Sequence, residues 1–280
     1  ERLAGVETDR PKRLSEAVEQ YLEHLKRRVR AKDLSNASFY SNRSAMKKIL
    51  KFKDIALEKM DKEYALDLKR CFLKDKKLCN NSYALYFAKL ISLWKWLEDT
   101  HGFLPNKNLK VKIKTETTEF VTLSQEEVEN LWNAELTENL NKAREVLLIL
   151  IHTGMRYSDY LSLKDSEINK DQWHIYKKAQ KTQTFFKVPI NPKIRHLFKK
   201  ELYRPSNPQI NNQLKIICAK LGIEKNVTTH AGRHTFVTRC MTLGVPQNII
   251  MGYCGWKSTN MIAKYASTLN VDNIDYLAQF

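Results

Sequence analysis

Four short stretches of the sequence contain residues that could do chemistry. They are "TGMRYSDY" with Arg156, "AQKTQ" with Lys181, "THAGRH" with His230 and Arg233, and "WKSTNMIAKY", which ends at Tyr265. Arginine and lysine could bind an anion, histidine could transfer a proton, and tyrosine could act as a nucleophile. Each side chain taken alone has a commoner role, as a solvated cation, a helix cap or a half-buried ring. None of them alone identifies an activity.

The order and spacing of the four stretches resemble those of the tyrosine recombinase, or phage integrase, family across residues 118–280. "TGMRYSDYLSL" resembles the arginine box of that family, in which an acid follows the arginine by three residues, here Asp159. "QKT" before "FFKVPI" resembles its β-hairpin lysine, and "HAGRHTF" resembles its HxxRH box. "GWKSTNMIAKY" resembles its last box, where a His or Trp, here Trp256, precedes the nucleophilic tyrosine by nine residues. Four separately spaced motifs in the right order make a specific match.

The resemblance implies transesterification at a DNA phosphodiester, with Tyr265 forming a 3′-phosphotyrosine bond. Arg156 and Arg233 would hold the non-bridging oxygens of the transition state. His230 would accept the phenol proton, and Lys181 would protonate the departing 5′-oxygen. We expect no metal, because the two arginines and the lysine supply the positive charge. We expect no ATP and no other cofactor, because the covalent bond stores the energy for religation.

Four further positions around these motifs are expected to support the site. Asp159 is expected to support an arginine or the hairpin, and His234 to orient its neighbours or simply to pack. Trp256 stands where histidine is the commoner residue, and its indole cannot exchange a proton near neutral pH, so we expect it to buttress the site or donate a hydrogen bond. Gly232 stands where a bulkier residue commonly precedes the arginine, which predicts looser local packing.

Residues 14–102 are expected to form a helical lobe. Apolar residues at helical spacing predict helices at about 14–29, 36–52, 61–74 and 80–102, the last with an Asn cap and an end near Gly102. Four helices with short connections predict a four-helix bundle, which resembles the family's SAM-like core-binding domain. On the second helix, Arg43, Lys47 and Lys48 lie opposite the apolar face. We expect them to contact DNA, and a solvated face is the ordinary alternative.

The rest of the chain is expected to consist of a linker and an α-rich catalytic domain. Residues 103–117 contain a proline and alternating lysines but no helical stripe, which indicates an extended basic linker or an ordinary loop. Beyond residue 118 most segments have helical patterns, whereas "QWHIYKKAQKTQTFFKVPI" alternates and predicts two or three strands. The fold class is therefore mainly α, with an N-terminal four-helix bundle and an α-rich catalytic domain that carries a small antiparallel β-sheet. Residues 1–13 are expected to be an N-terminal extension.

Composition agrees with a nucleic-acid partner. The net charge is +17, and the excess is spread over both lobes and the linker, which favours double-stranded DNA held on a broad surface. No apolar run approaches the roughly 18 to 20 residues of a membrane helix, and we expect no membrane partner and no secretory signal peptide. Five cysteines without a CxxC pair indicate reduced thiols in a cytosolic protein. His230 and His234 lack an HExxH context, so no metal site is expected.

Residues 268–280 form a terminal segment with apolar residues at near-helical spacing. In the family such tails pack on a neighbouring subunit, so the resemblance implies a homo-tetramer on DNA joined through this tail; packing within the same subunit is the alternative. The resemblance also implies accessory DNA-bending or directionality proteins. The first residue is Glu and not Met, which we take as a sign of a longer protein with an upstream arm-binding domain.

The expected activity is site-specific recombination, for integration and excision of a mobile element, at the nucleoid in the bacterial cytoplasm. Two alternatives stay open. A type IB topoisomerase-like enzyme would cleave and religate one strand without exchanging partners. A catalytically inactive relative would only bind DNA. For a recombinase and for a topoisomerase-like enzyme alike, the spacing from Trp256 selects Tyr265 over Tyr253 and Tyr276 as the nucleophile.

Overall fold

The structure is a computed structural model, and it describes residues 10–75, 79–102, 111–116 and 119–266. The chain divides into two compact units, residues 1–117 (the first unit) and residues 118–280 (the second unit). The predicted C-terminal tail and most of the predicted N-terminal extension lie outside the described residues. Among the residues that the structure describes, no helix combines the length and the apolarity needed to cross a membrane.

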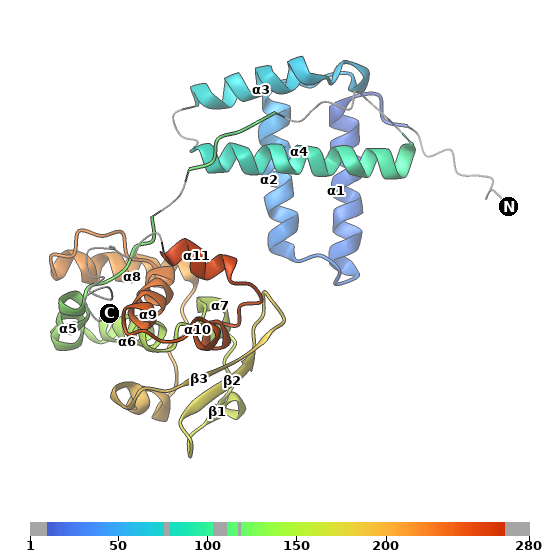
Figure 1. The fold of residues 1–280 in the computed structure, drawn as a ribbon. Helices are drawn as coiled ribbons and strands as arrows, with labels where there is room; N and C mark the ends of the chain where they lie inside the picture. The colour runs from blue at the N-terminus through green and yellow to red at the C-terminus, as the bar shows by residue number, and fades with distance from the viewer. Residues whose placement is uncertain (1–9, 76–78, 103–110, 117–118, 267–280) are drawn as a thin grey trace, which may run out of the picture. The chain divides into compact units, whose positions relative to one another are not determined.

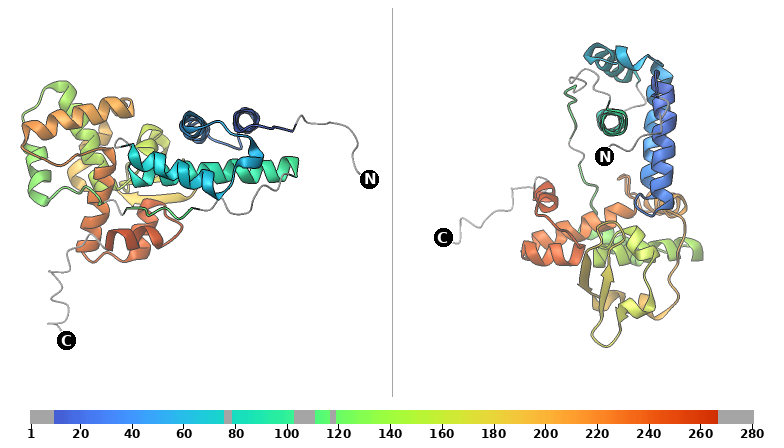
Figure 2. Two further views of the ribbon diagram at one scale, coloured as in Figure 1. Left: turned by 90° about the horizontal axis from the view of Figure 1, so that it is seen from above. Right: turned by 90° about the vertical axis from the view of Figure 1, so that its right-hand side faces the viewer.

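The first unit is a helical bundle, as predicted. Its described helices are α1 (Leu14–Arg30), α2 (Asn36–Phe52), η1 (Leu57–Lys59, a 3-10 turn), α3 (Lys62–Lys74) and α4 (Asn80–His101). Helices α1 and α2 lie side by side, and α4 crosses both of them (Figures 1 and 2). The apolar faces of all four long helices meet in one core, in which Met46, Leu68 and Leu93 are completely buried.

The helix ends of the first unit follow from local sequence. The Ser35 hydroxyl accepts a hydrogen bond from the amide of Ser38 at the start of α2, and the Asp61 carboxylate does the same for Tyr64 at the start of α3. Gly102 ends α4 in the left-handed conformation, with φ of 59°. The predicted Asn cap of α4 is wrong, because the helix already begins at Asn80 and the capping position is Cys79, whose side chain makes no capping hydrogen bond.

The described second half of the predicted linker, residues 111–116, is docked on the first unit. Val111 and Ile113 pack against the core of the bundle. The amide group of Asn81 donates to the backbone carbonyl of Glu116 and accepts from its N–H, both at 3.0 Å. This half of the predicted linker is therefore held against the bundle. Its lysines alternate with apolar residues, and alternation in extended backbone puts the two kinds on opposite sides, so that one side can pack.

The second unit combines helices with one small sheet. The helices are α5 (Gln125–Asn133), α6 (Glu138–Thr153), α7 (Tyr157–Leu161), α8 (Asn207–Lys220), α9 (Thr229–Thr242), α10 (Gln247–Cys254) and α11 (Asn260–Ala266), with 3-10 turns η2 (Asp165–Glu167) and η3 (Pro192–Lys199). The described strands β1 (Ile168–Asn169), β2 (His174–Lys178) and β3 (Phe185–Pro189) form an antiparallel sheet in the order β1-β2-β3. This confirms the predicted class, mainly α with a small antiparallel sheet.

Helices α6 and α9 form the centre of the second unit, and β3 packs against α10 (Figure 1). Gly232 lies where α9 meets α6. A Cβ atom at this position would lie 2.7 Å from Cβ of Leu150 and 3.3 Å from the backbone nitrogen of Ile151. The helices are therefore too close for any side chain here, and the predicted looser packing is wrong. The glycine allows the α9 residues of the HxxRH box to come close to α6.

Replacing Gly232 by alanine is expected to lower the free energy of unfolding by about 1–3 kcal/mol, because the added methyl group overlaps Leu150. Gly252 is the matched control, since it lies within α10 and a Cβ there would meet no atom within 4 Å. Gly252→Ala is expected to stabilise the protein by up to about 1 kcal/mol. Urea unfolding of both variants tests this, and changes of the same sign and size would contradict it.

Candidate active site

The arginine turn begins at Gly154, which ends α6 with φ of 63°. A Cβ atom here would lie 2.2 Å from the ring of Phe236, so both the backbone conformation and the space require glycine. The chain then turns so that Arg156 caps α7. Nη1 of Arg156 lies 3.7 Å from Oδ2 of Asp159, too far for a hydrogen bond, and it has no hydrogen-bond partner among the described residues. A buried guanidinium nitrogen without a partner is available to an anion.

Arg233 holds the turn from the other side. Its side chain is buried on α9, and it donates from Nη1 to the Gly154 carbonyl at 2.7 Å and from Nη2 to the Cys254 carbonyl at 2.8 Å. Its guanidinium also lies 5.0 Å from the centre of the Trp256 ring. Because a guanidinium has five N–H groups, these two bonds leave further donors for a ligand. Trp256 thus packs on the arginine, as a buttressing residue would.

Lys181 lies in the turn between β2 and β3 and is exposed. The turn is fixed on both sides of the lysine. The backbone N–H of Gln180 donates to Oδ1 of Asp159 at 2.8 Å, and the Thr182 hydroxyl donates to the Gly255 carbonyl at 3.3 Å. Asp159 is only 1% exposed. Through its hydrogen bond to Gln180 and its ion pair with Arg156, it connects the hairpin to the arginine turn. Its contacts are those of a supporting residue.

His230 lies in the first turn of α9 and is exposed at the surface. Partial burial of its ring lowers its pKa, and the positive charges of Arg233, Arg156 and Lys181 lower it further. Lys181 and the two arginines therefore lie close enough to His230 to lower its pKa. A histidine with a lowered pKa is neutral at pH 7 and is able to accept a proton.

Tyr265 lies on α11 and is only 1% exposed. Its hydroxyl lies 2.6 Å from Nδ1 of His234, and its ring centre lies 5.7 Å from that of Trp256. Burial raises the pKa of Tyr265 well above its usual value, against the opposing effect of Arg233 and Arg156. The structure thus brings the predicted nucleophile to the two arginines, and its hydroxyl is hydrogen-bonded to His234, the histidine with the smaller predicted role.

One ring of this cluster was not predicted. Phe120 stacks on His234 with ring centres 4.3 Å apart and on Tyr265 with ring centres 4.4 Å apart. It precedes α5 in a segment without helix or strand, and "EFVTL" has no feature that indicates a site. The carbonyl groups of Gly154 and Cys254, which bind Arg233, were also not predicted, because backbone acceptors have no residue signature.

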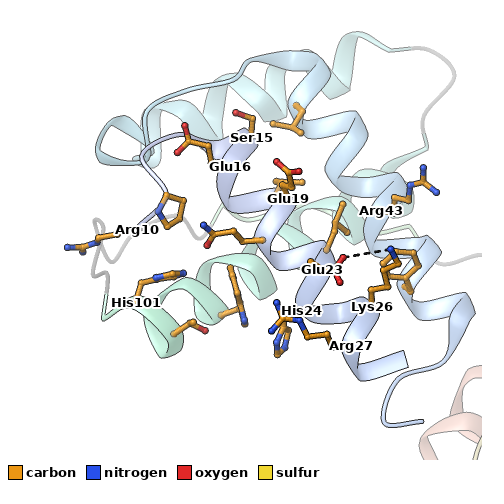
Figure 3. A pocket seen from close by; sticks show the side chains of 18 of the residues that line it. Arg10, Ser15, Glu16, Glu19, Glu23, His24, Lys26, Arg27, Arg43 and His101 are labelled. Atoms are coloured by element: carbon orange, nitrogen blue, oxygen red, sulfur yellow. Dashed lines mark ion pairs between the residues drawn. The ribbon is translucent and has the colours of Figure 1, made fainter. Parts of the chain in front are cut away.

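The three basic residues predicted to contact DNA do not form one uniform surface. Lys47 is exposed on α2, whereas Nζ of Lys48 lies 4.0 Å from the carboxylate of Asp75. Arg43 lines an open groove beside α1 (Figure 3). That groove is lined by side chains of both charges. The acidic ones are three glutamates of α1, and the basic ones besides Arg43 are Arg10, Lys26 and Arg27. The DNA contact of Arg43, Lys47 and Lys48 stays a prediction.

Two histidines of the second unit should make its stability depend on pH. Burial lowers the pKa of both His152 and His234 to about 4, helped by nearby positive charges. Between about pH 4 and 6.5 the unfolded chain therefore binds protons that the folded chain excludes, so stability is full above this window and falls as the pH falls through it. From pH 7.5 to 5.5 we expect each histidine to contribute a loss of about 1 kcal/mol.

Urea unfolding of the wild type and of His152→Gln at pH 7.5 and 5.5 measures this effect. The variant carries no titrating group at this position, so it should lose less stability than the wild type. Equal losses in the two proteins would show that His152 does not exclude a proton in the folded state.

The described residues contain no group of three or more His, Cys, Asp or Glu side chains that could hold a metal ion. The side chains gathered at the site are cationic, imidazole and phenol groups: Arg156, Arg233, Lys181, His230, His234 and Tyr265. Such a set can bind a phosphodiester, move protons and provide an oxygen nucleophile.

Comparison with known proteins agrees with this arrangement. The solved structure of a lambda integrase dimer bound to a COC′ core site is similar, with a TM-score of 0.77 and 16% identity over 90% of this chain and 95% of that chain. The Tn1549 transposon integrase in complex with transposon right end DNA has a TM-score of 0.74 and 16% identity over 95% of this chain and 98% of that chain. At these identities the likenesses show the fold alone. No curated protein matches the sequence.

The sequence pattern of the phage integrase SAM-like domain matches residues 13–96, in the helical bundle of the first unit. The pattern of the phage integrase family matches residues 121–270, which include the arginine turn, the hairpin, α9 and α11. The latter match alone spans more than half of the chain and contains all the residues of the cluster except Phe120. The chain therefore belongs to the phage integrase family, the tyrosine-type site-specific DNA recombinases.

Proposed function

We propose that this recombinase cleaves double-stranded DNA through Tyr265 and rejoins it by the reverse reaction. The observation that carries the proposal is that two guanidinium groups lie near one buried tyrosine, while Lys181 and His230 lie near the same arginines. Nη1 of Arg156 has no hydrogen-bond partner among the described residues, and Arg233 keeps unused donors. A phosphate oxygen would satisfy both, since guanidinium groups bind phosphate in a planar, two-donor geometry.

In the proposed reaction, the phenol oxygen of Tyr265 bonds to phosphorus and the bond from phosphorus to the 5′-oxygen breaks. His230 accepts the phenol proton, and Lys181 donates a proton to the departing oxygen, which leaves as a 5′-hydroxyl. The arginines bind the non-bridging oxygens, where negative charge increases in the transition state. A 5′-hydroxyl from the same or another strand then attacks the phosphotyrosine and releases the phenol of Tyr265. Each step forms one phosphodiester bond for the one that it breaks, so no ATP is needed.

The assembly on DNA is part of the same proposal. The similar lambda integrase structures include a dimer bound to a core site and a tetramer bound to a Holliday junction. By analogy we propose a homo-tetramer of this chain on DNA, joined through residues 268–280 and assisted by accessory DNA-bending or directionality proteins. Integration and excision of a mobile element, at the nucleoid of a bacterial cell, is the corresponding biological role.

A nicked suicide DNA substrate tests the proposal, because the short strand released after cleavage diffuses away and the protein stays attached. The DNA should be a pool of sites, since the target sequence is not known. The wild type is expected to form a covalent adduct that survives denaturation, and Tyr265→Phe is expected to form none. Tyr253→Phe is the matched control, since Tyr253 lies on the neighbouring helix α10, and it should form the adduct normally.

Two other outcomes would replace the proposal. If the wild type forms no adduct on any site while it still binds DNA, the chain is a binding protein without cleavage activity. If it relaxes a supercoiled plasmid without a specific site and never exchanges strands, it acts like a type IB topoisomerase.

A further inference from the structure

The hydroxyl of Tyr265 is not in a position to attack DNA in this structure. The side chain is 1% exposed, and its oxygen is hydrogen-bonded to Nδ1 of His234 at 2.6 Å. Attack requires the oxygen to come within about 3–3.5 Å of phosphorus. The phosphate of a duplex lies on a bulky double helix and cannot follow the hydroxyl into the protein, so the tyrosine has to move.

The rings of Phe120 and His234, from two other segments of the chain, hold Tyr265 in this position. Phe120 covers both of its partners, with interplanar angles of 22° to His234 and 27° to Tyr265. The rings of His234 and Tyr265 are themselves 5.4 Å apart. Stacked aromatic pairs of this kind are stabilising beyond the area that they bury. The set of Phe120, His234 and Tyr265 is called the aromatic clamp below.

The clamp is anchored to α9 on the side of Phe120. The backbone N–H of Leu123 donates to the Thr235 hydroxyl at 2.9 Å, and both residues are buried. Phe120 and Leu123 therefore lie along consecutive residues of α9, His234 and Thr235. In the sequence, Phe120 follows the boundary between the two units by three residues.

The charge states agree with a resting position. Burial lowers the pKa of His234 to about 4 and raises that of Tyr265, so both groups are neutral at pH 7 and share one hydrogen bond. A neutral phenol is a poor nucleophile, because attack uses the phenolate or a phenol that is losing its proton. In this position the tyrosine is therefore both inaccessible and unactivated.

We propose that Phe120 and His234 are positioning residues that hold Tyr265 in a resting position, and that the clamp must open before the hydroxyl can reach a DNA phosphate. This inference rests on the proposed role of Tyr265 as the nucleophile. Opening transfers the hydroxyl from His234 to the side of Arg156, Lys181 and His230, where its proton can leave. The clamp then delays cleavage until the segment around Phe120 has moved.

Nitration of the DNA-free protein with tetranitromethane tests the resting position without reference to DNA cleavage. Tyr40 and Tyr176, which are 59% and 52% exposed, are internal references within the same chain. In the wild type, the peptide with Tyr265 should be nitrated much more slowly than the two reference peptides. Phe120→Ala should increase the rate at Tyr265 by at least about tenfold, because local opening then needs less free energy. Phe120→Tyr, which keeps the ring, should preserve the slow rate.

A second pair of variants tests the hydrogen bond and avoids the larger cavity of Phe120→Ala. His234→Ala should also accelerate nitration of Tyr265, whereas His234→Asn should preserve much of the protection, since its amide can replace Nδ1 in the bond. Val245→Ala is the control for general loosening, because Val245 packs against the same small core but contributes no ring to the clamp. It should leave Tyr265 protected.

The rate of adduct formation on the suicide substrate is the second readout. Because the clamp opposes the reaction, Phe120→Ala should form the adduct faster than the wild type at saturating DNA, whereas a merely structural loss would slow it. Nitration of wild-type Tyr265 as fast as Tyr176, or protection that survives both alanine variants, would overturn the clamp. These nitration results do not depend on cleavage. If Tyr265→Phe still forms the adduct, the proposed function fails while the nitration result stands.

Discussion

Arg233→Lys is expected to reduce the rate of covalent adduct formation by at least about 10³-fold and to destabilise the second unit as well. The guanidinium binds two buried carbonyl groups, those of Gly154 and Cys254, at the same time. An ammonium group is a single point of charge without the planar fork, so one carbonyl would lose its partner. A buried acceptor without a partner costs about 1–3 kcal/mol. Single-turnover cleavage and urea unfolding measure the two effects.

Arg156→Lys is the matched control, because it makes the same chemical change at a position that does not hold two helices together. Its Nη1 has no hydrogen-bond partner among the described residues, and its nearest acid lies 3.7 Å away. Cleavage should fall by about 10²–10³-fold, as for the loss of one transition-state donor, with little change in unfolding. If Arg156→Lys cleaved at the wild-type rate, the arginine turn would not be the phosphate site.

Lys181→Ala is expected to slow cleavage by about 10²–10⁴-fold, the usual contribution of a positioned general acid. The lysine is exposed, and the turn that carries it is held by the backbone of Gln180 and the hydroxyl of Thr182. The variant should therefore fold normally, which separates loss of the proton donor from loss of structure. Single-turnover adduct formation on the suicide substrate measures the rate.

The leaving group distinguishes an acid from a phosphate-binding cation. A substrate with sulfur in place of the bridging 5′-oxygen releases a thiolate, which needs no proton. Lys181→Ala should cleave this substrate at nearly the rate of the wild type. Lys178→Ala is the control, since Lys178 is exposed at the end of β2 in the same hairpin, and it should cleave both substrates normally. A loss in Lys181→Ala that persists with the sulfur substrate would assign Lys181 to binding only.

Most of the fold could be predicted because its signals are local. Helix starts at Ser35 and Asp61, and the helix end at Gly102, depend on residues within one turn. The hairpin lysine follows from a period-two pattern on both sides of a turn. The segment Pro192–Lys199 is one of those with a helical pattern beyond residue 118, but it forms a 3-10 helix, because apolar spacing over so few residues hardly distinguishes the two helix types.

The candidate site could be predicted only as far as its motifs reach. The stretches around Arg156, Lys181, Arg233 and Tyr265 do come together in the structure, in the second unit. The Phe120 stack could not be foreseen, since it depends on a tertiary contact between a segment without regular structure and α9. The prediction for Gly232 is wrong because it also depends on a tertiary contact. A small residue leaves a gap only if its neighbours keep their distance, and here α6 packs directly against the glycine.

The most direct test of the account is to locate the covalent bond. After reaction with the suicide substrate, the adduct is digested with protease and nuclease, and the modified peptide is sequenced by mass spectrometry. The account predicts a 3′-phosphonucleotide on Tyr265 and a released strand with a free 5′-hydroxyl. A nucleotide on Tyr253, on another residue or through a 5′-phosphate would contradict it.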